Sequence, residues 1–194
     1  DQAPPTVSCP ANVSVAAPSG QCSAVVSYTT PSASDNCSGA TVTCSPASGA
    51  TFPVGTTTVT CTATDGGGNT ASCTFVVHVA DTASPTLTCP SNITTAAGAG
   101  QCSAVVSYTT PSASDNCSGA TVACSPASGS TFAVGTTTVS CTATDAAGNT
   151  ASCSFSVTVT DATGPAIACP APISVPAAAG ACSAVVSYGL PAAS

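Results

Sequence analysis

Cysteine and aspartate are the side chains of this sequence that could do chemistry, because the chain has 14 Cys, seven acidic residues and no Lys or Arg. So many thiols in 194 residues are typical of a disulfide-stabilised protein from an oxidising compartment. The closest spacing, between Cys37 and Cys44, is wider than that of a zinc site, and the chain has one His. We therefore expect a secreted protein, extracellular or on a cell surface, whose cysteines form bridges.

The aspartates recur at three kinds of position: the junctions between repeated segments, an Asp-Asn-Cys loop and a Thr-Ala-Thr-Asp loop. Gathered carboxylates repel one another unless they are screened, protonated or bound to a metal ion, and oxygen ligands suit Ca²⁺. The alternative is that Asp and the neighbouring Asn residues shape turns through hydrogen bonds to the backbone. The candidate calcium ligands are Asp35, Asp65, Asp81, Asp115 and Asp145.

The charge balance argues against several classes of partner and reaction. Phosphate recognition depends on Lys and Arg, so we expect no nucleic-acid binding, and no apolar run is long enough for membrane insertion. A catalytic Ser-His-Asp arrangement needs a His, yet His78 is the only one and Thr158 replaces it in the second repeat. We therefore expect no enzymatic activity.

An 80-residue repeat organises the chain. Residues 21–42 are identical to residues 101–122, and every cysteine of the first repeat returns 80 positions later. We expect repeats at 1–80 and 81–160, followed by an incomplete third repeat at 161–194 that has its first strands only. The remainder is interpreted as a window on a longer array, because repeat arrays need neighbours and caps. The alternative is a hairpin that inserts into another molecule.

The elements that must position these residues are strands. Alternating apolar and polar residues, with Gly and Pro between the runs, predict six or seven short strands in each repeat and no helix. This pattern is typical of an all-β, disulfide-rich chain of tandem immunoglobulin-like β-sandwiches. In such a sandwich the B–C and F–G loops share one pole with the N-terminal entry. Asp81, Asp115 and Asp145 are therefore expected to converge where the repeats join.

The order of motifs resembles the hyalin repeat, or HYR, domain family. The motifs are an early Cys-Pro, then GQCSAVVSY, DNCSGA, TFPVGTTTVTCTATD and GNTASCTFVVHV, and they cover nearly the whole of both complete repeats. The resemblance implies an immunoglobulin-like fold, a role in adhesion or in building extracellular structures, and no catalysis. It also implies a bridge between the first and last strands, which joins Cys9 to Cys73.

The remaining cysteines are paired by strand placement. Cys44 and Cys61 both point inward on neighbouring strands and are expected to bond. Cys22 and Cys37 are left as the third pair of the first repeat. The second repeat is expected to follow the same scheme, with bridges Cys89–Cys153, Cys102–Cys117 and Cys124–Cys141.

Two features are expected at the surface of the repeats. A row of Thr at every second position, from Thr56 to Thr64, faces solvent on one strand, and the adjacent strands show no matching row. Four Asn residues open N-glycosylation sequons, for which chance in a Thr-rich chain is the alternative explanation. These are Asn12, Asn36, Asn92 and Asn116.

Two functions fit this sequence. The first is an extracellular structural protein in which tandem HYR-like repeats form a fibre, stalk or filament by self-association or by contact with neighbouring repeats. Near-identical copies favour it, because they present identical surfaces at a regular spacing. The alternative is an adhesin whose Asp- and Asn-rich loops recognise a carbohydrate or protein ligand of a cell surface or matrix, with Ca²⁺ as the bound ion.

Overall fold

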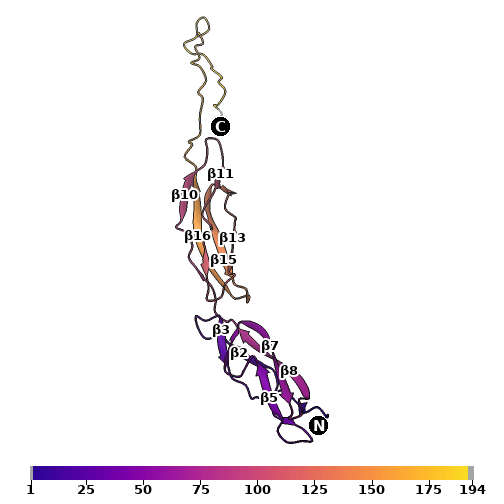
Figure 1. Cartoon of the computed structure of the whole chain (residues 1–194). Coiled ribbons are helices and arrows are strands. Elements are labelled where there is room, and N and C mark those ends of the chain that lie inside the picture. The colour runs from indigo at the N-terminus through magenta and orange to yellow at the C-terminus, as the bar shows by residue number, and fades with distance from the viewer. Residues whose placement is uncertain (1, 192–194) are drawn as a thin grey trace.

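Two β-sandwich units, joined end to end, make up most of the computed structural model, which describes residues 2–191 (Figure 1). All of the regular elements in these residues are strands, so the all-β fold expected from the alternating pattern is confirmed. In the same residues no helix is long and apolar enough to cross a membrane.

The first unit has eight strands, more than the six or seven expected. One sheet has the order β2-β8-β7-β5, and the pairs β3-β6 and β1-β4 form the smaller sheets. β2 runs parallel to β8, whereas the other pairs are antiparallel. The strands are β1 (Thr6–Val7), β2 (Val13–Ala16), β3 (Ser23–Val26), β4 (Ala33–Ser34), β5 (Thr41–Ser45), β6 (Ala50–Pro53), β7 (Gly55–Thr64) and β8 (Thr70–Ala80).

The second unit repeats this topology 80 residues later. Its large sheet has the order β10-β16-β15-β13, beside the pairs β11-β14 and β12-β9. The strands are β9 (Thr86–Leu87), β10 (Ile93–Ala96), β11 (Ser103–Val106), β12 (Ala113–Ser114), β13 (Thr121–Ser125), β14 (Ser130–Ala133), β15 (Gly135–Thr144) and β16 (Thr150–Thr160).

The core of each unit lies between the large sheet and the β3-β6 or β11-β14 pair. In the first unit, Phe52 of β6 is fully buried and belongs to the same cluster as Val59 and Phe75 of the large sheet. Tyr28 meets the edge of Phe75, with ring centroids 4.9 Å apart, and its hydroxyl donates a hydrogen bond to the Pro46 carbonyl. The phenol is therefore satisfied while its ring adds apolar area to a core with few aromatic residues.

Hydroxyl side chains cover the outward face of the large sheet on neighbouring strands. In the second unit Thr136 lies opposite Thr158, with their hydroxyl oxygens 3.1 Å apart, and Ser140 lies opposite both Ser154 and Ser125. The expectation that adjacent strands lack a matching row is therefore wrong. The register brings Ser and Thr of three strands into the same phase, and each such cross-strand pair contributes about 0.2–1 kcal/mol.

Two disulfides lie within each unit. One joins the segment after the first strand to the last strand, and the other joins directly opposite residues of two neighbouring strands of the large sheet. These are the pairs that the sequence led us to expect for these eight cysteines. They are Cys9–Cys73 and Cys44–Cys61 in the first unit, and Cys89–Cys153 and Cys124–Cys141 in the second.

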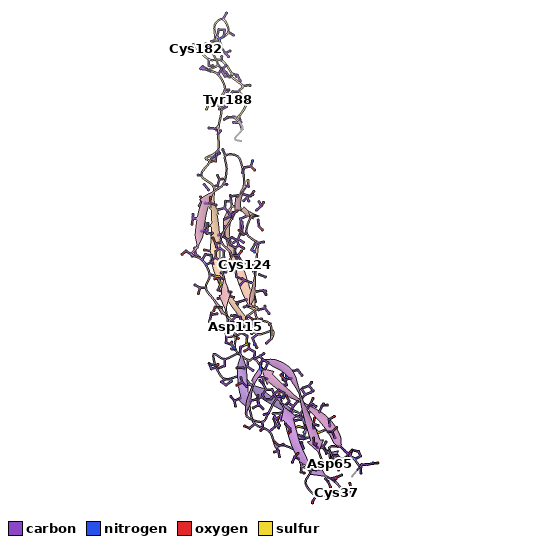
Figure 2. The ribbon with its side chains drawn as sticks, in the orientation of Figure 1. Cys37, Asp65, Asp115, Cys124, Cys182 and Tyr188 are labelled. Atoms are coloured by element: carbon purple, nitrogen blue, oxygen red, sulfur yellow. A yellow bond between two sulfur atoms is a disulfide. The ribbon has the colours of Figure 1, made fainter. Side chains whose placement is uncertain are left out.

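The expected bridges Cys22–Cys37 and Cys102–Cys117 are wrong. Cys22 lies in the loop before β3, at the pole of the first unit that meets the second unit, and it bonds to Cys117 across the joint. Cys37 follows β4 at the opposite pole, at the tip of the first unit (Figure 2). The length of the sandwich thus separates Cys22 from Cys37. Cys37 and Cys102 are exposed, and neither is in a disulfide within the described residues.

Residues 161–191 leave the far end of the second unit as an exposed excursion (Figure 1). The expected first strands of a third repeat do not form in them: they hold an isolated bridge residue, Ile167, and a turn in which Ala181 N–H donates to the Ala178 carbonyl. In the complete units β2 and β3 pair with β8 and β6 of the same unit. In residues 161–191 the segments equivalent to β2 and β3 form no strand and pair with no other strand of the described residues.

Candidate functional site at the joint between the units

The joint between the two units is built from three loops. The turn before β3 supplies Gln21 and Cys22, the linker after β8 supplies Asp81, and the loop between β12 and β13 supplies Asn116 and Cys117. The Cys22–Cys117 disulfide closes it, with the two Cα atoms 5.1 Å apart, inside the usual range for such bridges. Successive repeats are therefore linked covalently at a second point besides the peptide backbone.

Side-chain amides add hydrogen bonds around the disulfide. The Asn116 Nδ2 donates to the Gln21 carbonyl at 2.9 Å and to Asp81 Oδ1 at 3.2 Å. The Asn149 Nδ2 donates to the Asp81 carbonyl at 3.2 Å. Asn116 thus binds to the first unit, to the linker and, through its chain, to the second unit, so that its position depends on all three.

Two carboxylates meet at the joint, as the sequence led us to expect for Asp81 and Asp115. Their oxygens and the Cys117 sulfur lie within 4.8 Å of one another, and Asp81 is buried. The Cys117 sulfur is committed to the bridge with Cys22 and is not a thiolate ligand. Asp81 Oδ1 accepts from Ala83 N–H and Asp115 Oδ2 from Cys117 N–H, so both carboxylates stabilise local turns. Two carboxylates supply few of the six to eight oxygens that Ca²⁺ takes, and calcium binding stays a prediction.

Asp145 is buried near the joint but serves its own loop. Its two oxygens accept hydrogen bonds from the backbone N–H and the Nδ2 of Asn149, both at 2.8 Å. Burial alone raises the pKa of the Asp145 carboxyl, and the hydrogen bonds from Asn149 and from neighbouring backbone N–H groups outweigh it, so the pKa lies below its ordinary value. The Asn149 Nδ2 contacts both Asp145 and the Asp81 carbonyl, which ties this loop to the linker.

The other two candidate ligands lie at the far end of the first unit. Asp65 is the equivalent of Asp145, and the Asn69 side chain holds the pKa of its carboxyl below the ordinary value, assisted by backbone N–H groups and opposed by burial. Asp35 accepts a hydrogen bond from Cys37 N–H. Figure 2 shows Asp65 and Cys37 at the tip, remote from Asp115 at the joint. The five predicted ligands are therefore divided between two poles, with Asp81, Asp115 and Asp145 near the joint as the sequence led us to expect, and Asp35 and Asp65 at the free end of the first unit.

The four sequons have different surroundings. Asn12 and Asn92 are exposed, and each Oδ1 accepts a backbone N–H from the last strand, of Val76 and Ser156 respectively. Asn36 is exposed in the loop at the tip. Asn116 is different, because the amide nitrogen that would carry a glycan is hydrogen-bonded within the joint.

Sequence reasoning missed the two amides that hold the joint together, Asn116 and Asn149. Asn116 was predicted as a glycan site, whereas the structure makes it a donor to the linker carboxylate. A signal for the bridge across the joint was present in the sequence: β3 lies between Cys22 and Cys37, and a strand that runs along the sandwich places the residues before and after it toward opposite poles. Asn116 Oδ1 is buried without a hydrogen-bond partner in the described part of the chain.

Comparison with known proteins places this architecture in a family. The HYR domain model matches residues 1–79 and 80–159. The chain is 46% identical over 113 residues to hyalin of Strongylocentrotus purpuratus, covering 56% of the chain and 9% of that protein. For hyalin of Lytechinus variegatus the identity is 38% over 112 residues, covering 56% and 21%. The chain thus spans a small part of the length of these relatives.

Among solved structures, the extracellular cadherin domains 1–5 of protocadherin gamma B2 align with a TM-score of 0.43 at 14% identity, covering 85% of this chain and 40% of that one. Drosophila N-cadherin domains EC1–4 align with a TM-score of 0.41 at 15% identity, covering 83% and 50%. The assignment rests on the family model instead, since its two consecutive matches account for both sandwich units. The chain belongs to the HYR domain family, of which it contains two complete tandem copies.

Proposed function

We propose that this chain is an extracellular structural protein whose HYR repeats stack into a rod, as part of a fibre, stalk or matrix filament. The main support for this proposal is the Cys22–Cys117 bridge, which fixes one repeat to the next at a point distant in sequence from the linker. A chain whose repeats only presented separate binding sites has no need of such a bond. The five disulfides suit an oxidising, extracellular setting.

The absence of cationic side chains supports the same role. A surface of Ser and Thr hydroxyls without Lys or Arg offers no electrostatic site for anionic partners, whereas it presents the same uncharged face in each unit. The similarity to hyalin supports a place in a matrix or in adhesion.

Electron microscopy of the oxidised chain, alone and at high concentration, tests the proposal. We expect two-unit rods with one fixed bend at the joint, as in Figure 1, that associate end to end into uniformly beaded filaments. The matched control is the Cys22→Ser/Cys117→Ser variant, in which we expect the same two units with a broad distribution of angles between them. Isolated rods at every concentration, together with binding to a glycan or protein array, would favour the adhesin instead. Long filaments without beading would contradict a repeat array.

A further inference from the structure

Four cysteines of the described residues are outside the bridges, and the two that belong to the sandwich units occupy related positions. Cys102 occupies in the second unit the position that Cys22 has in the first, and Cys37 occupies in the first unit the position that Cys117 has in the second. Cys22 and Cys117 bond to each other across the joint. Each unit therefore carries one half of a joint at one pole and the complementary half at the other, and Cys37 and Cys102 are the halves that form no disulfide within residues 2–191.

The surroundings of Cys102 match those of Cys22. The Cys22 carbonyl accepts from Val54 N–H at 3.1 Å, and the Cys102 carbonyl accepts from Val134 N–H at 2.9 Å. The turns that precede the two cysteines are closed by the same kind of bond, from the N–H of Gln21 and from that of Gln101. A groove of about 330 Å³ lies beside Cys102. The backbone at Cys102 is thus already in the conformation that Cys22 has in the closed joint.

The surroundings of Cys37 match those of Cys117 in the same way. Cys37 N–H donates to Asp35 Oδ2 at 3.1 Å, and Cys117 N–H donates to Asp115 Oδ2 at 3.0 Å. The preceding Asn side chain approaches the cysteine sulfur in both loops, at 3.6 Å for Cys37 and 3.4 Å for Cys117. Because bond formation across the joint needs no change in either loop, ordering costs little when a partner arrives.

We propose that Cys37 and Cys102 each form the same joint with a further HYR repeat, and that a second copy of this chain can supply that repeat, Cys102 of one copy bonding to Cys37 of the next. This inference rests on the proposed role as a linear array and names the chemistry that joins its members. The two halves differ, so the contact is heterologous and leaves a new half at each end. A head-to-tail contact of this kind extends the rod instead of closing a dimer.

The bond requires an oxidant, which we take to be a low-molecular-weight disulfide such as glutathione disulfide. One protein thiolate attacks a sulfur of that disulfide, forms a mixed disulfide and releases one thiol. The thiolate of the second copy then attacks the protein sulfur of the mixed disulfide, forms the Cys37–Cys102 bond and releases the second thiol. Two protein thiols lose two protons and two electrons, and the small disulfide gains them as two thiols.

The test uses the full chain with Cys169→Ser and Cys182→Ser, which removes the two other exposed thiols. Two further variants in this background, Cys37→Ser and Cys102→Ser, are oxidised in a glutathione buffer separately and as an equimolar mixture. The parent is expected to give a ladder of reducible oligomers on non-reducing gels. Each further variant alone is expected to stay monomeric, and the mixture is expected to stop at dimers.

A protease that cleaves before Asp identifies the bond, and the absence of Lys and Arg makes trypsin useless. Fragment 35–64 is linked to no other fragment by the five bridges of the structure, so its linkage to fragment 81–114 reports the Cys37–Cys102 bond. Linkage of fragment 1–34 to fragment 115–144 shows that the internal joint is intact in every sample.

Three results would overturn the inference. The first is that the mixture of the two variants stays monomeric although the internal joint is intact. The second is that either variant alone forms as many dimers as the mixture. The third is that the Cys37–Cys102 bond forms within one monomer. None of them contradicts the proposed structural role, because that role is judged by the shape of the two-unit rod and by filaments that form without covalent bonds. Failure of the rods themselves in the microscope, with the internal joint present, would overturn the proposed function alone.

Discussion

Removing the Cys22–Cys117 bridge is the perturbation for which the structure gives the clearest magnitude. When the first unit unfolds while the second stays folded, the bridge closes a loop from Cys22 to the start of the second unit, about 60 residues long. The Cys9–Cys73 bridge shortens the free path around that loop to about 20 residues. Chain entropy then gives a stabilisation of about 3–4 kcal/mol at 25 °C.

The assay is differential scanning calorimetry of the Cys22→Ser/Cys117→Ser variant beside the parent. For a unit of this size each kcal/mol shifts the Tm by about 4–8 °C, so we expect the first transition to fall by about 12–32 °C. The matched control is Cys37→Ser/Cys102→Ser, which removes two exposed thiols that form no bridge within the described residues. We expect the monomer of this control to have the same Tm as the parent monomer when both are measured without reducing agent.

The same samples carry their own check on the pairing. Cleavage before Asp leaves fragment 1–34 linked to fragment 115–144 if Cys22 bonds to Cys117, and linked to fragment 35–64 if Cys22 bonds to Cys37. The second linkage, or an unchanged Tm in the bridge variant when the first linkage is present in the parent, would refute the reasoning.

Three further predictions concern single side chains. In a host that attaches N-glycans, we expect occupancy at Asn36 to exceed that at Asn116 in chains with a closed joint, measured by glycopeptide mass spectrometry. Tyr28→Phe removes a part-buried hydrogen bond and is expected to cost the first unit about 1 kcal/mol in urea unfolding, whereas Tyr188→Phe, in the exposed excursion, changes nothing. Because the pKa of Asp145 is lowered in the folded chain, ionised Asp145 contributes stability that is complete above the ordinary pKa of Asp. This stability is lost as the pH falls through the pKa that Asp145 has in the folded chain. We therefore expect the free energy of unfolding of the Asp145→Asn variant to depend less on pH below about 4 than that of the parent, measured by urea unfolding.

Local alternation was sufficient to predict the all-β fold and the bridge between neighbouring strands of each unit, whereas the Cys9–Cys73 bridge followed from the family resemblance. Cys44 shares a phase with Val42, and Cys61 shares a phase with Val59, and that period-two pattern decides which way a side chain points on a strand. The structure places Cys44 directly opposite Cys61. This kind of pairing depends on two adjacent strands and therefore can be read from two short segments.

The joint could not be predicted in this way, because it depends on where loops lie at the ends of two separate units. Cys22 and Cys37 are 15 positions apart in sequence, yet β3 carries the chain from one pole toward the other between them. Cys22 and Cys117 are separated by 95 residues and meet at one pole. The expectation that adjacent strands lack a matching row of hydroxyls was wrong for a related reason. The sequence of each strand shows which of its residues alternate, but only the register between strands shows that the hydroxyls of neighbouring strands lie opposite one another.

The composition explains why the joint is covalent. A chain without Lys or Arg cannot neutralise the carboxylates of Asp81 and Asp115 with ion pairs, so amide donors such as Asn116 must do so through hydrogen bonds. Each such bond contributes about 1–3 kcal/mol, less than a disulfide that closes a long loop. Since no Lys or Arg is present to form an ion pair at the joint, we expect salt to weaken the joint little and a reductant to break the one disulfide that closes it. Rigidity of the two-unit rod, measured by small-angle X-ray scattering, should therefore persist in 1 M NaCl and disappear in the Cys22→Ser/Cys117→Ser variant; a rod that bends in salt with its bridge closed would show that electrostatics hold the joint.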